Sequence, residues 1–234
     1  MKIVFNTGAG ISVPSGIPCY RGPNGIYTKN PELEQSLTAE VYAKNPLQVF
    51  NAIVNMQELI SKTQPNAAHI AIAELEKYHD VTVITQNVDN LHNAAGSTNV
   101  IELHGNIFFL KCLDCGQIFQ EAPWGSIGCF ICEGINLRSN VVLFGEDLPA
   151  DAFTKACSAV TEADVVVTIG TSGDVAPANT LLDIANDRAY HHKAKFYYIN
   201  LDKPLMYVPF AQMIFESAEV AVPNLCDALK IFKD

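Results

Sequence analysis

The sequence predicts an α/β protein in which a domain built on a parallel sheet carries a smaller inserted domain. Short apolar segments alternate with helical or loop segments along most of the chain, a pattern typical of strands joined by crossover helices. Two pairs of cysteines interrupt this alternation near the middle of the chain. With 234 residues, 49% of them hydrophobic, the chain is long enough for one substantial core and a small insert.

Six short apolar segments are predicted to be strands of the sheet. Each is nearly continuous in hydrophobic character, as expected for parallel strands that are buried on both faces. They cover residues 2–8, 81–87, 99–105, 140–146, 163–172 and 195–202.

Two amphipathic helices are predicted between the first and second strands. The first opens with a cap residue and a proline, covers residues 45–62, and has the apolar stripe Leu47, Phe50 and Val54. The second lies within residues 65–80, where apolar residues recur at the spacing of one helix face, namely Ala68, Ala71, Ile72, Leu75 and Tyr78.

Four of the seven cysteines form two CxxC pairs, Cys112 with Cys115 and Cys129 with Cys132. In each pair one tight turn brings two thiolates together, and two such turns complete the tetrahedral four-sulfur shell that zinc prefers. A redox CxxC motif would account for one pair and leave the other unexplained. We therefore expect one structural Zn²⁺ with no open position for a reacting water.

The stretch NTGAGISVPSGIPCYRG, residues 6–22, follows the first strand. Its glycines offer backbone that can approach a pyrophosphate closely, as dinucleotide-binding folds require. Val13 replaces the third glycine of the usual dehydrogenase fingerprint, and the prolines break the helix that would follow, which disfavours a hydride-transferring oxidoreductase. We expect a loop that closes over a dinucleotide, with an apolar wall, a ring and a phosphate-pairing guanidinium from Ile17, Tyr20 and Arg21.

Polar side chains stand at the carboxyl ends of four predicted strands, where open α/β sheets bind their ligands. They are Gln86, Asn87, Asp89, His104, Thr171, Ser172 and Asn200. His104 is the candidate general base, because a neutral imidazole can accept a hydroxyl proton near pH 7. His69 and His92 are interpreted as structural histidines.

The composition limits the classes of partner that the protein is expected to bind. A net charge of −10 weighs against sequence-blind nucleic-acid binding, which depends on clustered Lys and Arg. The apolar stretches fall short of the ~20 residues that a membrane span needs, and residues 1–12 lack a signal-peptide pattern. We expect a cytoplasmic monomer with no membrane contact and no direct nucleic-acid contact.

In combination, these motifs resemble the sirtuins, the NAD-dependent protein deacylases, in their compact bacterial form. The stretches GAGISVPSGIPCYRG, QPNAAH, TQNVDNLH, ELHG, NVVLFGE, GTSGDVAPA and YYINLD, with the two CxxC pairs, appear in the family's order over nearly the whole chain. The resemblance implies a Rossmann-like parallel sheet domain with a smaller zinc-binding and helical domain inserted. Ser139 departs from the pattern, since a proline commonly precedes NVVLFGE.

The resemblance also implies a role for each site residue. NAD would be cradled by Gly8, Ala9, Gly10, Ser12, Ile17, Tyr20 and Arg21, with Gln86, Asn87 and Asp89 around the nicotinamide and its ribose. The adenosine half would be held by Gly170, Thr171, Ser172, Asn200 and Ala218. His104 becomes the catalytic base, with Asn87 and Asp89 beside it. An acyl-lysine peptide would pair with Gly145, Glu146 and the stretch Gly173 to Val175, and its acyl chain would lie along Val142 and Phe144.

The implied reaction is lysine deacylation that releases nicotinamide and O-acyl-ADP-ribose. Sirtuins that remove succinyl or malonyl groups resemble one another in a Tyr and an Arg upstream of PNAAH, and residues 45–64 contain neither. A buried acyl carboxylate would then lack a partner, so acetyl or longer apolar acyl groups are predicted. The alternatives are ADP-ribosyl transfer or NAD hydrolysis at the same site, or a non-catalytic NAD-sensing or zinc-based interaction module.

The predicted domain division follows the motifs. The Rossmann-like NAD-binding domain takes residues 1–30, 81–109 and 140–234. The small domain combines a helical module, residues 31–80, with a zinc-binding module, residues 110–139.

Overall fold

The computed structural model describes residues 1–22, 24–120, 128–192 and 194–231. Its centre is a six-stranded sheet with the strand order β3-β2-β1-β7-β8-β9, in which every neighbouring pair is parallel. The strands are β1 (Lys2–Thr7), β2 (Asp80–Thr85), β3 (Val100–Glu102), β7 (Val165–Ile169), β8 (Lys195–Ile199) and β9 (Gln212–Ile214). The predicted parallel α/β sheet is confirmed.

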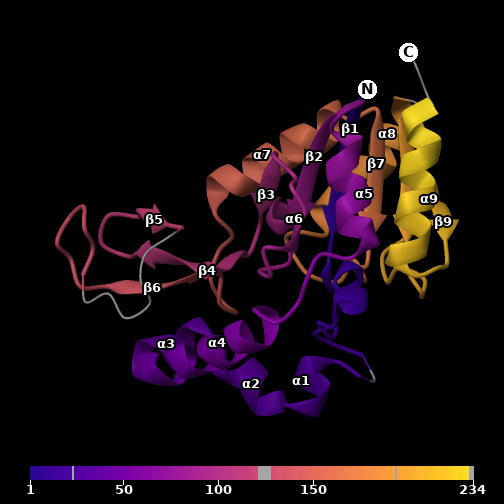
Figure 1. Ribbon diagram of the computed structural model, residues 1–234. Helices are drawn as coiled ribbons and strands as arrows, with labels where there is room; N and C mark the ends of the chain where they lie inside the picture. The colour runs from indigo at the N-terminus through magenta and orange to yellow at the C-terminus, as the bar shows by residue number, and fades with distance from the viewer. Residues whose placement is uncertain (23, 121–127, 193, 232–234) are drawn as a thin grey trace.

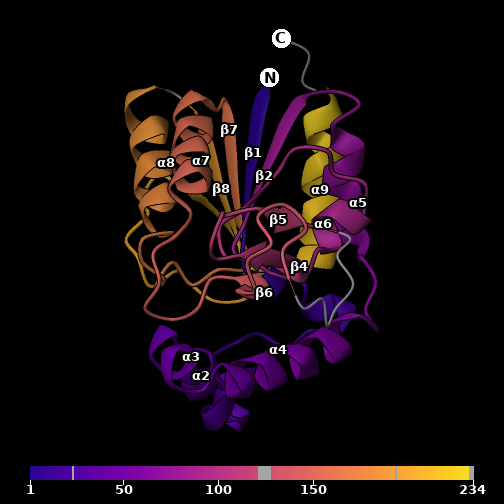
Figure 2. The same ribbon diagram turned by 90° about the vertical axis from the view of Figure 1, so that its left-hand side faces the viewer.

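Helices cover both faces of this sheet, as Figure 2 shows. On one face lie α5 (Ala67–Leu75) and α9 (Ala218–Ile231), and on the other lie α7 (Ala150–Glu162) and α8 (Thr180–His191). Each pair contributes its apolar side chains to a separate hydrophobic core against the strands. The short helix α6 (Leu91–Ala94) follows β2.

A second, smaller region lies beyond the carboxyl ends of the strands (Figure 1). It contains an antiparallel sheet, order β5-β4-β6, built from β4 (Gly105–Cys112), β5 (Ile118–Phe119) and β6 (Leu137–Val141). Below that sheet lie α1 (Ile26–Lys29), α2 (Pro31–Ser36), α3 (Ala39–Lys44) and α4 (Pro46–Ile60). These helices and β4 share a third apolar core, which also contains Ile17 and Leu143.

Three sequence predictions are wrong in detail. Tyr78, predicted on the apolar face of the second helix, lies beyond the end of α5 and is 57% exposed. Residues 140–146 were expected as a strand of the parallel sheet, but only their first two residues lie in a strand, β6, which pairs antiparallel with β4. Helix α4 forms as predicted, with Asn45 Oδ1 accepting from the Gln48 N–H at 3.3 Å. However, its predicted stripe residues Leu47 and Phe50 are exposed, and the buried face is formed by Val49, Ala52, Ile53 and Ile60.

Helix α5 bears on the domain division. Its buried residues Ala68, Ile72 and Leu75 lie in the same core as β1, β2 and α9, not in the core of α1 to α4. This packing favours ending the helical module before α5, so that α5 counts with the parallel sheet. The division itself stays a prediction, and residues 121–127 of the predicted zinc module lie outside the described residues.

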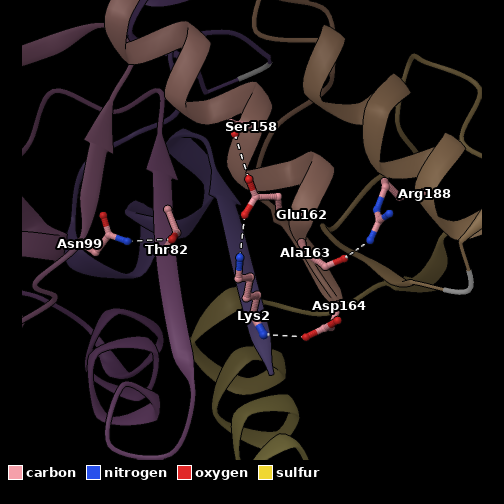
Figure 3. Close-up of polar contacts among 8 residues, drawn as sticks. All are labelled: Lys2, Thr82, Asn99, Ser158, Glu162, Ala163, Asp164 and Arg188. Carbon is pink, nitrogen blue, oxygen red and sulfur yellow. Dashed lines mark hydrogen bonds and ion pairs between the residues drawn. The ribbon is translucent and has the colours of Figure 1, made fainter.

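The amino ends of the strands are joined to α7 by polar contacts at the surface (Figure 3). Lys2 Nζ lies 2.6 Å from Glu162 Oε2, and the Lys2 backbone N–H donates to Asp164 Oδ2 at 2.7 Å. Beside them, Asn99 Nδ2 donates to Thr82 Oγ1 at 2.8 Å. These contacts lie at the edge of the sheet opposite the small region.

None of the helices in the described ranges is long and apolar enough to cross a membrane.

Candidate active site

The glycine-rich loop after β1 is fixed by the loop after β7. The Gly8 N–H donates to Ile169 O and the Gly10 N–H donates to Gly170 O, both at 2.9 Å. A Cβ on Gly10 would lie 2.5 Å from Gly170 Cα, and Gly170 itself has φ 62°. The glycines are therefore required because the two loops pack closely against each other. The sequence analysis gave a different reason, the close approach of a pyrophosphate.

The rest of the loop forms two short 3₁₀ turns, η1 (Ala9–Ile11) and η2 (Val13–Ser15), instead of one continuous helix, as predicted. The Ala9 N–H has no hydrogen-bond partner among the described residues. A free N–H on a glycine-rich turn is the kind of donor that an anionic phosphate group accepts.

Ser12, Asn87 and Asp89 form a buried network beneath this loop. Ser12 Oγ donates to Asp89 Oδ2 at 2.6 Å, and Asn87 Nδ2 donates to Ser12 Oγ at 3.2 Å and to Gly8 O at 3.1 Å. The three residues are between 1% and 6% exposed. Burial raises the pKa of the Asp89 carboxyl, although the Ser12 hydroxyl opposes this shift. The network joins the ends of β1 and β2.

His104 follows β3 at the same edge of the sheet. Its Nδ1 lies 2.7 Å from the Gln86 carbonyl oxygen, which can only accept a hydrogen bond, so Nδ1 carries the proton. Nε2 is then the unprotonated nitrogen, and it has no partner among the described residues. Burial lowers the pKa of His104, with the Gln86 carbonyl opposing. The residue is therefore a neutral base near pH 7 with a fixed tautomer.

The end of β7 is tied to the end of β8. Thr171 O accepts from the Tyr198 hydroxyl and from Asn200 Nδ2, the latter at 3.1 Å. Sequence reasoning placed Thr171 and Asn200 at strand ends but missed Tyr198. A buried tyrosine whose hydroxyl needs a partner was the available signal.

The remaining predicted cofactor residues are less closely grouped. Ser172 is exposed beside Thr171, Gln86 Nε2 lies 3.5 Å from Thr171 Oγ1, and Ala218 is buried at the start of α9. Ile17 is buried in the core of the small region. Arg21 is paired with Glu34 of α2 at 2.7 Å, with 59% and 35% of the two side chains exposed. Sequence reasoning missed Glu34.

The segment 142–146 bridges the small region and the strand ends. The Val142 N–H donates to His104 O, the Phe144 N–H donates to Leu37 O, and Phe144 O accepts from the Ala39 N–H. Phe144 is 42% exposed, and its ring packs edge-to-face with the Tyr27 ring, with 5.8 Å between the two ring centroids. Gly145 is exposed, with φ 87°, and makes no hydrogen bond within the described residues.

The side chain of Glu146 is already fully engaged. Its two carboxylate oxygens accept from Arg138 Nη1 and Nη2, each at 2.7 Å, and Oε2 also accepts from the Leu143 N–H at 2.9 Å. The Glu146 N–H donates to Leu143 O at 3.0 Å, so within the described residues only its carbonyl oxygen remains for an external partner. On the other candidate substrate stretch, Gly173 is buried while Val175 is 38% exposed.

The four predicted metal ligands meet at the tip of the antiparallel sheet. The sulfur atoms of Cys112, Cys115, Cys129 and Cys132 all lie within 4.8 Å of one another. The pairs Cys112–Cys132 and Cys115–Cys129 are each separated by 3.7 Å. A tetrahedral site with Zn–S bonds of 2.3 Å requires about 3.8 Å between sulfurs, so the cluster fits Zn²⁺.

The sequence matches the Sir2 family over residues 8–177, well over half of its length. The chain belongs to the Sir2 family. Membership in the Sir2 family confirms the sirtuin resemblance.

The Sir2 relatives cover most of the chain. It is 47% identical over 191 residues, 79% of this chain and 78% of the relative, to NAD-dependent protein deacylase 1 of Caldanaerobacter subterraneus subsp. tengcongensis. It is 39% identical over 233 residues, 97% and 90% of the two chains, to NAD-dependent protein deacylase 2 of Pyrobaculum aerophilum.

Solved structures of Sir2 proteins agree. A Sir2 homologue in complex with NAD superposes with a TM-score of 0.82 at 36% identity, covering 97% of this chain and 89% of that one. A Sir2 protein with a deacetylated p53 peptide and 3′-O-acetyl ADP-ribose has a TM-score of 0.80 at 31% identity, covering 98% and 94%.

Proposed function

We propose that this Sir2 protein is an NAD-dependent protein lysine deacylase that acts on acetyl-lysine and releases nicotinamide and O-acyl-ADP-ribose. The observation that carries the proposal is His104, a half-buried neutral imidazole whose Nδ1–H is held by the Gln86 carbonyl and whose Nε2 has no partner in the described part of the chain. The relatives named as NAD-dependent deacylases, and the homologue in complex with NAD, support the cofactor.

The residues of the site have different roles in the proposed reaction. Bound NAD supplies a ribose carbon that the acyl oxygen attacks as nicotinamide leaves. His104 Nε2 accepts a proton from a ribose hydroxyl, and Asn87 and Asp89 orient the nicotinamide end through side chains that Ser12 already holds in place. The amide oxygen is a poor nucleophile, so positioning and the exclusion of water are the main tasks of the loop over residues 8–21.

Arg21 would support the phosphates only after release from Glu34. The ion pair is solvent-exposed on both sides, and such pairs contribute little to stability, so a phosphate can replace the carboxylate. Ile17, Tyr20, Gln86, Gly170, Thr171, Ser172, Asn200 and Ala218 complete the proposed cofactor surface.

The acyl-lysine peptide is proposed to pair as an added strand between residues 145–146 and 173–175. The unpaired backbone of Gly145 supports this, as does the engagement of the Glu146 side chain elsewhere. Val142 and Phe144 are proposed to contact the acyl chain. Because helix α4 carries no positive side chain, acetyl or longer apolar acyl groups are preferred over succinyl and malonyl groups.

Mass spectrometry of an acetyl-lysine peptide incubated with the full chain, with and without NAD, tests the proposal. Loss of the acetyl group should require NAD and should fall about 10²–10⁴-fold in the His104→Ala variant, the usual contribution of a general base. Nicotinamide release with the acetyl group retained would favour ADP-ribosyl transfer or NAD hydrolysis. No NAD turnover with any acyl peptide would favour a sensing or interaction module.

We also propose that the protein is a cytoplasmic monomer. We propose as well that it does not bind nucleic acids, because a net charge of −10 does not favour contacts with the phosphates of a nucleic-acid backbone. The cysteine cluster is proposed to hold one structural Zn²⁺ that keeps the antiparallel sheet folded.

A further inference from the structure

The turn between β3 and β4 carries His104 at the carboxyl edge of the large sheet. β3 ends at Glu102 and β4 begins at Gly105, so only Leu103 and His104 lie between the two strands. Leu103 is fully buried in the core that α7 and α8 share with the sheet, and its N–H donates to Thr85 O at 2.9 Å. The place of the His104 ring therefore depends on how this short turn is closed.

The side chain of Asn106 closes the turn. Asn106 Nδ2 donates to Glu102 Oε1 at 2.6 Å, a bond that joins the last residue of β3 to the second residue of β4. The same Nδ2 donates to Asn90 Oδ1 at 3.0 Å, and Asn106 Oδ1 accepts from the Phe108 N–H at 3.0 Å. Asn106 is 0% exposed. A buried amide whose donor and acceptor atoms all have partners is held in one orientation.

The backbone around Asn106 is irregular in a way that suits this side chain. Gly105 has φ 77°, and a Cβ there would lie 1.6 Å from Asn140 O, so only glycine fits at this position. The pairing of β4 with β6 is irregular between Asn106 and Leu110, and within this stretch Asn106 Oδ1 accepts the Phe108 N–H. Irregular strand pairing of this kind often redirects a side chain next to an active site.

Asn90 lies at the end of the segment that holds the His104 ring. That segment begins with Gln86, whose carbonyl oxygen lies 2.7 Å from His104 Nδ1. Asn90 has φ 63°, a left-handed conformation, and its Oδ1 accepts from Asn106 Nδ2. The Asn106 amide therefore joins the turn that carries His104 to the segment that fixes the Nδ1 proton.

Asn93 donates to the same two oxygens from the surface. Its Nδ2 lies 2.8 Å from Asn90 Oδ1 and 3.1 Å from Glu102 Oε1. Asn93 is exposed, so water can replace its bonds, whereas Asn106 is buried. Burial raises the pKa of the Glu102 carboxyl, and the amides of Asn106 and Asn93 oppose this shift. The two asparagines form a matched pair, one buried and one exposed, on the same acceptors.

We infer that Asn106 is a positioning residue for the general base His104. By holding Glu102 and Asn90 together, its amide keeps the His104 Nδ1–H on the Gln86 carbonyl and leaves Nε2 unprotonated. A carbonyl that moves away from Nδ1 lets the imidazole carry its proton on Nε2, where the ring can no longer accept one. The inference deepens the proposed deacylase function, and its kinetic consequence rests on that function.

¹⁵N NMR of the histidine ring nitrogens in the full chain tests the inference without substrate. At pH 7 the parent should show His104 as the Nδ1–H tautomer alone, with the signal assigned by the His104→Gln variant. Asn106→Leu, which fills the same volume without a donor, should show a mixture of the two tautomers. Asn93→Leu, the same change at the exposed amide, should match the parent.

Steady-state deacylation of the acetyl-lysine peptide gives a second readout. In Asn106→Leu, kcat should fall about 10²-fold, the cost of displacing a catalytic group by about 1 Å, while KM for NAD stays within about twofold. Asn93→Leu should keep the kcat of the parent. If Asn106→Leu fails to fold, Asn90→Gly removes one acceptor at a φ that glycine adopts freely, and should lower kcat about fivefold, the loss of one hydrogen bond.

Three results would overturn the inference. These are an unmixed Nδ1–H tautomer in Asn106→Leu, equal changes in Asn106→Leu and Asn93→Leu, and a fall in kcat that is matched by a rise in KM for NAD, which would assign Asn106 to cofactor binding. If the parent does not deacylate the peptide, the proposed function fails, and the NMR comparison still decides whether Asn106 positions His104.

Discussion

The amino and carboxyl edges of the six-stranded sheet are formed by the same strands, but polar side chains are exposed to solvent at one edge and buried at the other. At the amino edge, Lys2 and Glu162 form an ion pair with 54% and 56% of the side chains exposed, in contact with solvent (Figure 3). At the carboxyl edge, Ser12, Asn87 and Asp89 are almost fully buried and bonded to one another. Water can replace a partner at the first edge and cannot at the second.

The difference shows that only the carboxyl edge holds its polar side chains in a fixed geometry. A buried polar network is favourable only when every member is satisfied, and then it holds its side chains in one geometry. The carboxyl edge therefore presents a preformed surface to a ligand, as a binding or catalytic site requires. The amino edge has no such demand, so substitutions at the two edges should differ in cost.

The largest effect is expected for Gly170→Ala. The alanine must adopt φ 62°, and its Cβ would lie 2.5 Å from Gly10 Cα. Left-handed strain and overpacking together should lower the free energy of unfolding by about 2–5 kcal/mol. Gly96 has φ 100° but open space around it, so Gly96→Ala should show the strain alone, about 1–2 kcal/mol. Urea unfolding that gave equal losses would refute the interlock of the two loops.

The next effect concerns the buried histidines behind the loop. His69 is fully buried, its ring lies 4.8 Å from that of His92, and burial lowers the pKa of His69 to about 4. His69 Nδ1 accepts from the Asn66 N–H, and no carboxylate of the described residues contributes to the pKa shift of either histidine. In the unfolded chain the His69 imidazole takes up a proton near pH 6.5, whereas in the folded protein it stays neutral down to a lower pH. The free energy of unfolding therefore has its full value above pH 6.5 and declines as the pH falls toward 4.

By pH 5 the loss from His69 should reach about 2 kcal/mol. Unfolding measured at pH 7 and pH 5 should show a smaller difference for His69→Gln than for the parent chain. The exposed His192→Gln should behave like the parent. If His69→Gln kept the full pH dependence, the acid sensitivity would belong to other groups.

Asn87→Leu tests the buried network directly. The leucine fills a similar volume but leaves Gly8 O and Ser12 Oγ without the Asn87 Nδ2 donor, which should cost about 1–3 kcal/mol. The matched change at the amino edge is Asn99→Leu, which removes an exposed bond to Thr82 and should cost less than about 0.5 kcal/mol. Equal costs in thermal unfolding would remove the distinction between the two edges.

Much of the carboxyl edge could be predicted because its signals are local. His104, Asn87, Asp89 and Thr171 directly follow apolar runs, so strand order alone brings them to one edge. The cysteine spacing likewise predicted the sulfur cluster that the structure contains. Family resemblance supplied the roles that residue type and position left open.

The features that the sequence did not predict depend on long-range packing. The register of α4 was wrong because Leu47 and Phe50 fit a helical stripe as well as Val49 and Ile53 do, and only the tertiary contacts decide between them. Strand β9 lies in an edge position and is too short to give a periodic signal. The bond from Arg138 to Glu146 joins residues whose separation carries no pattern in the sequence.

The smallest effect is expected for Glu162→Gln at the amino edge. The change removes the charge opposite Lys2, but an exposed pair gains little over hydration and is screened by salt. Lys2 lowers the pKa of Glu162, so any contribution is present above the unfolded pKa of a glutamate and is lost as the pH falls. The melting temperature should stay within experimental error of the parent at physiological salt, and NAD binding by calorimetry should be unchanged. A fall as large as that of Asn87→Leu would mean that the amino edge also depends on a fixed polar network.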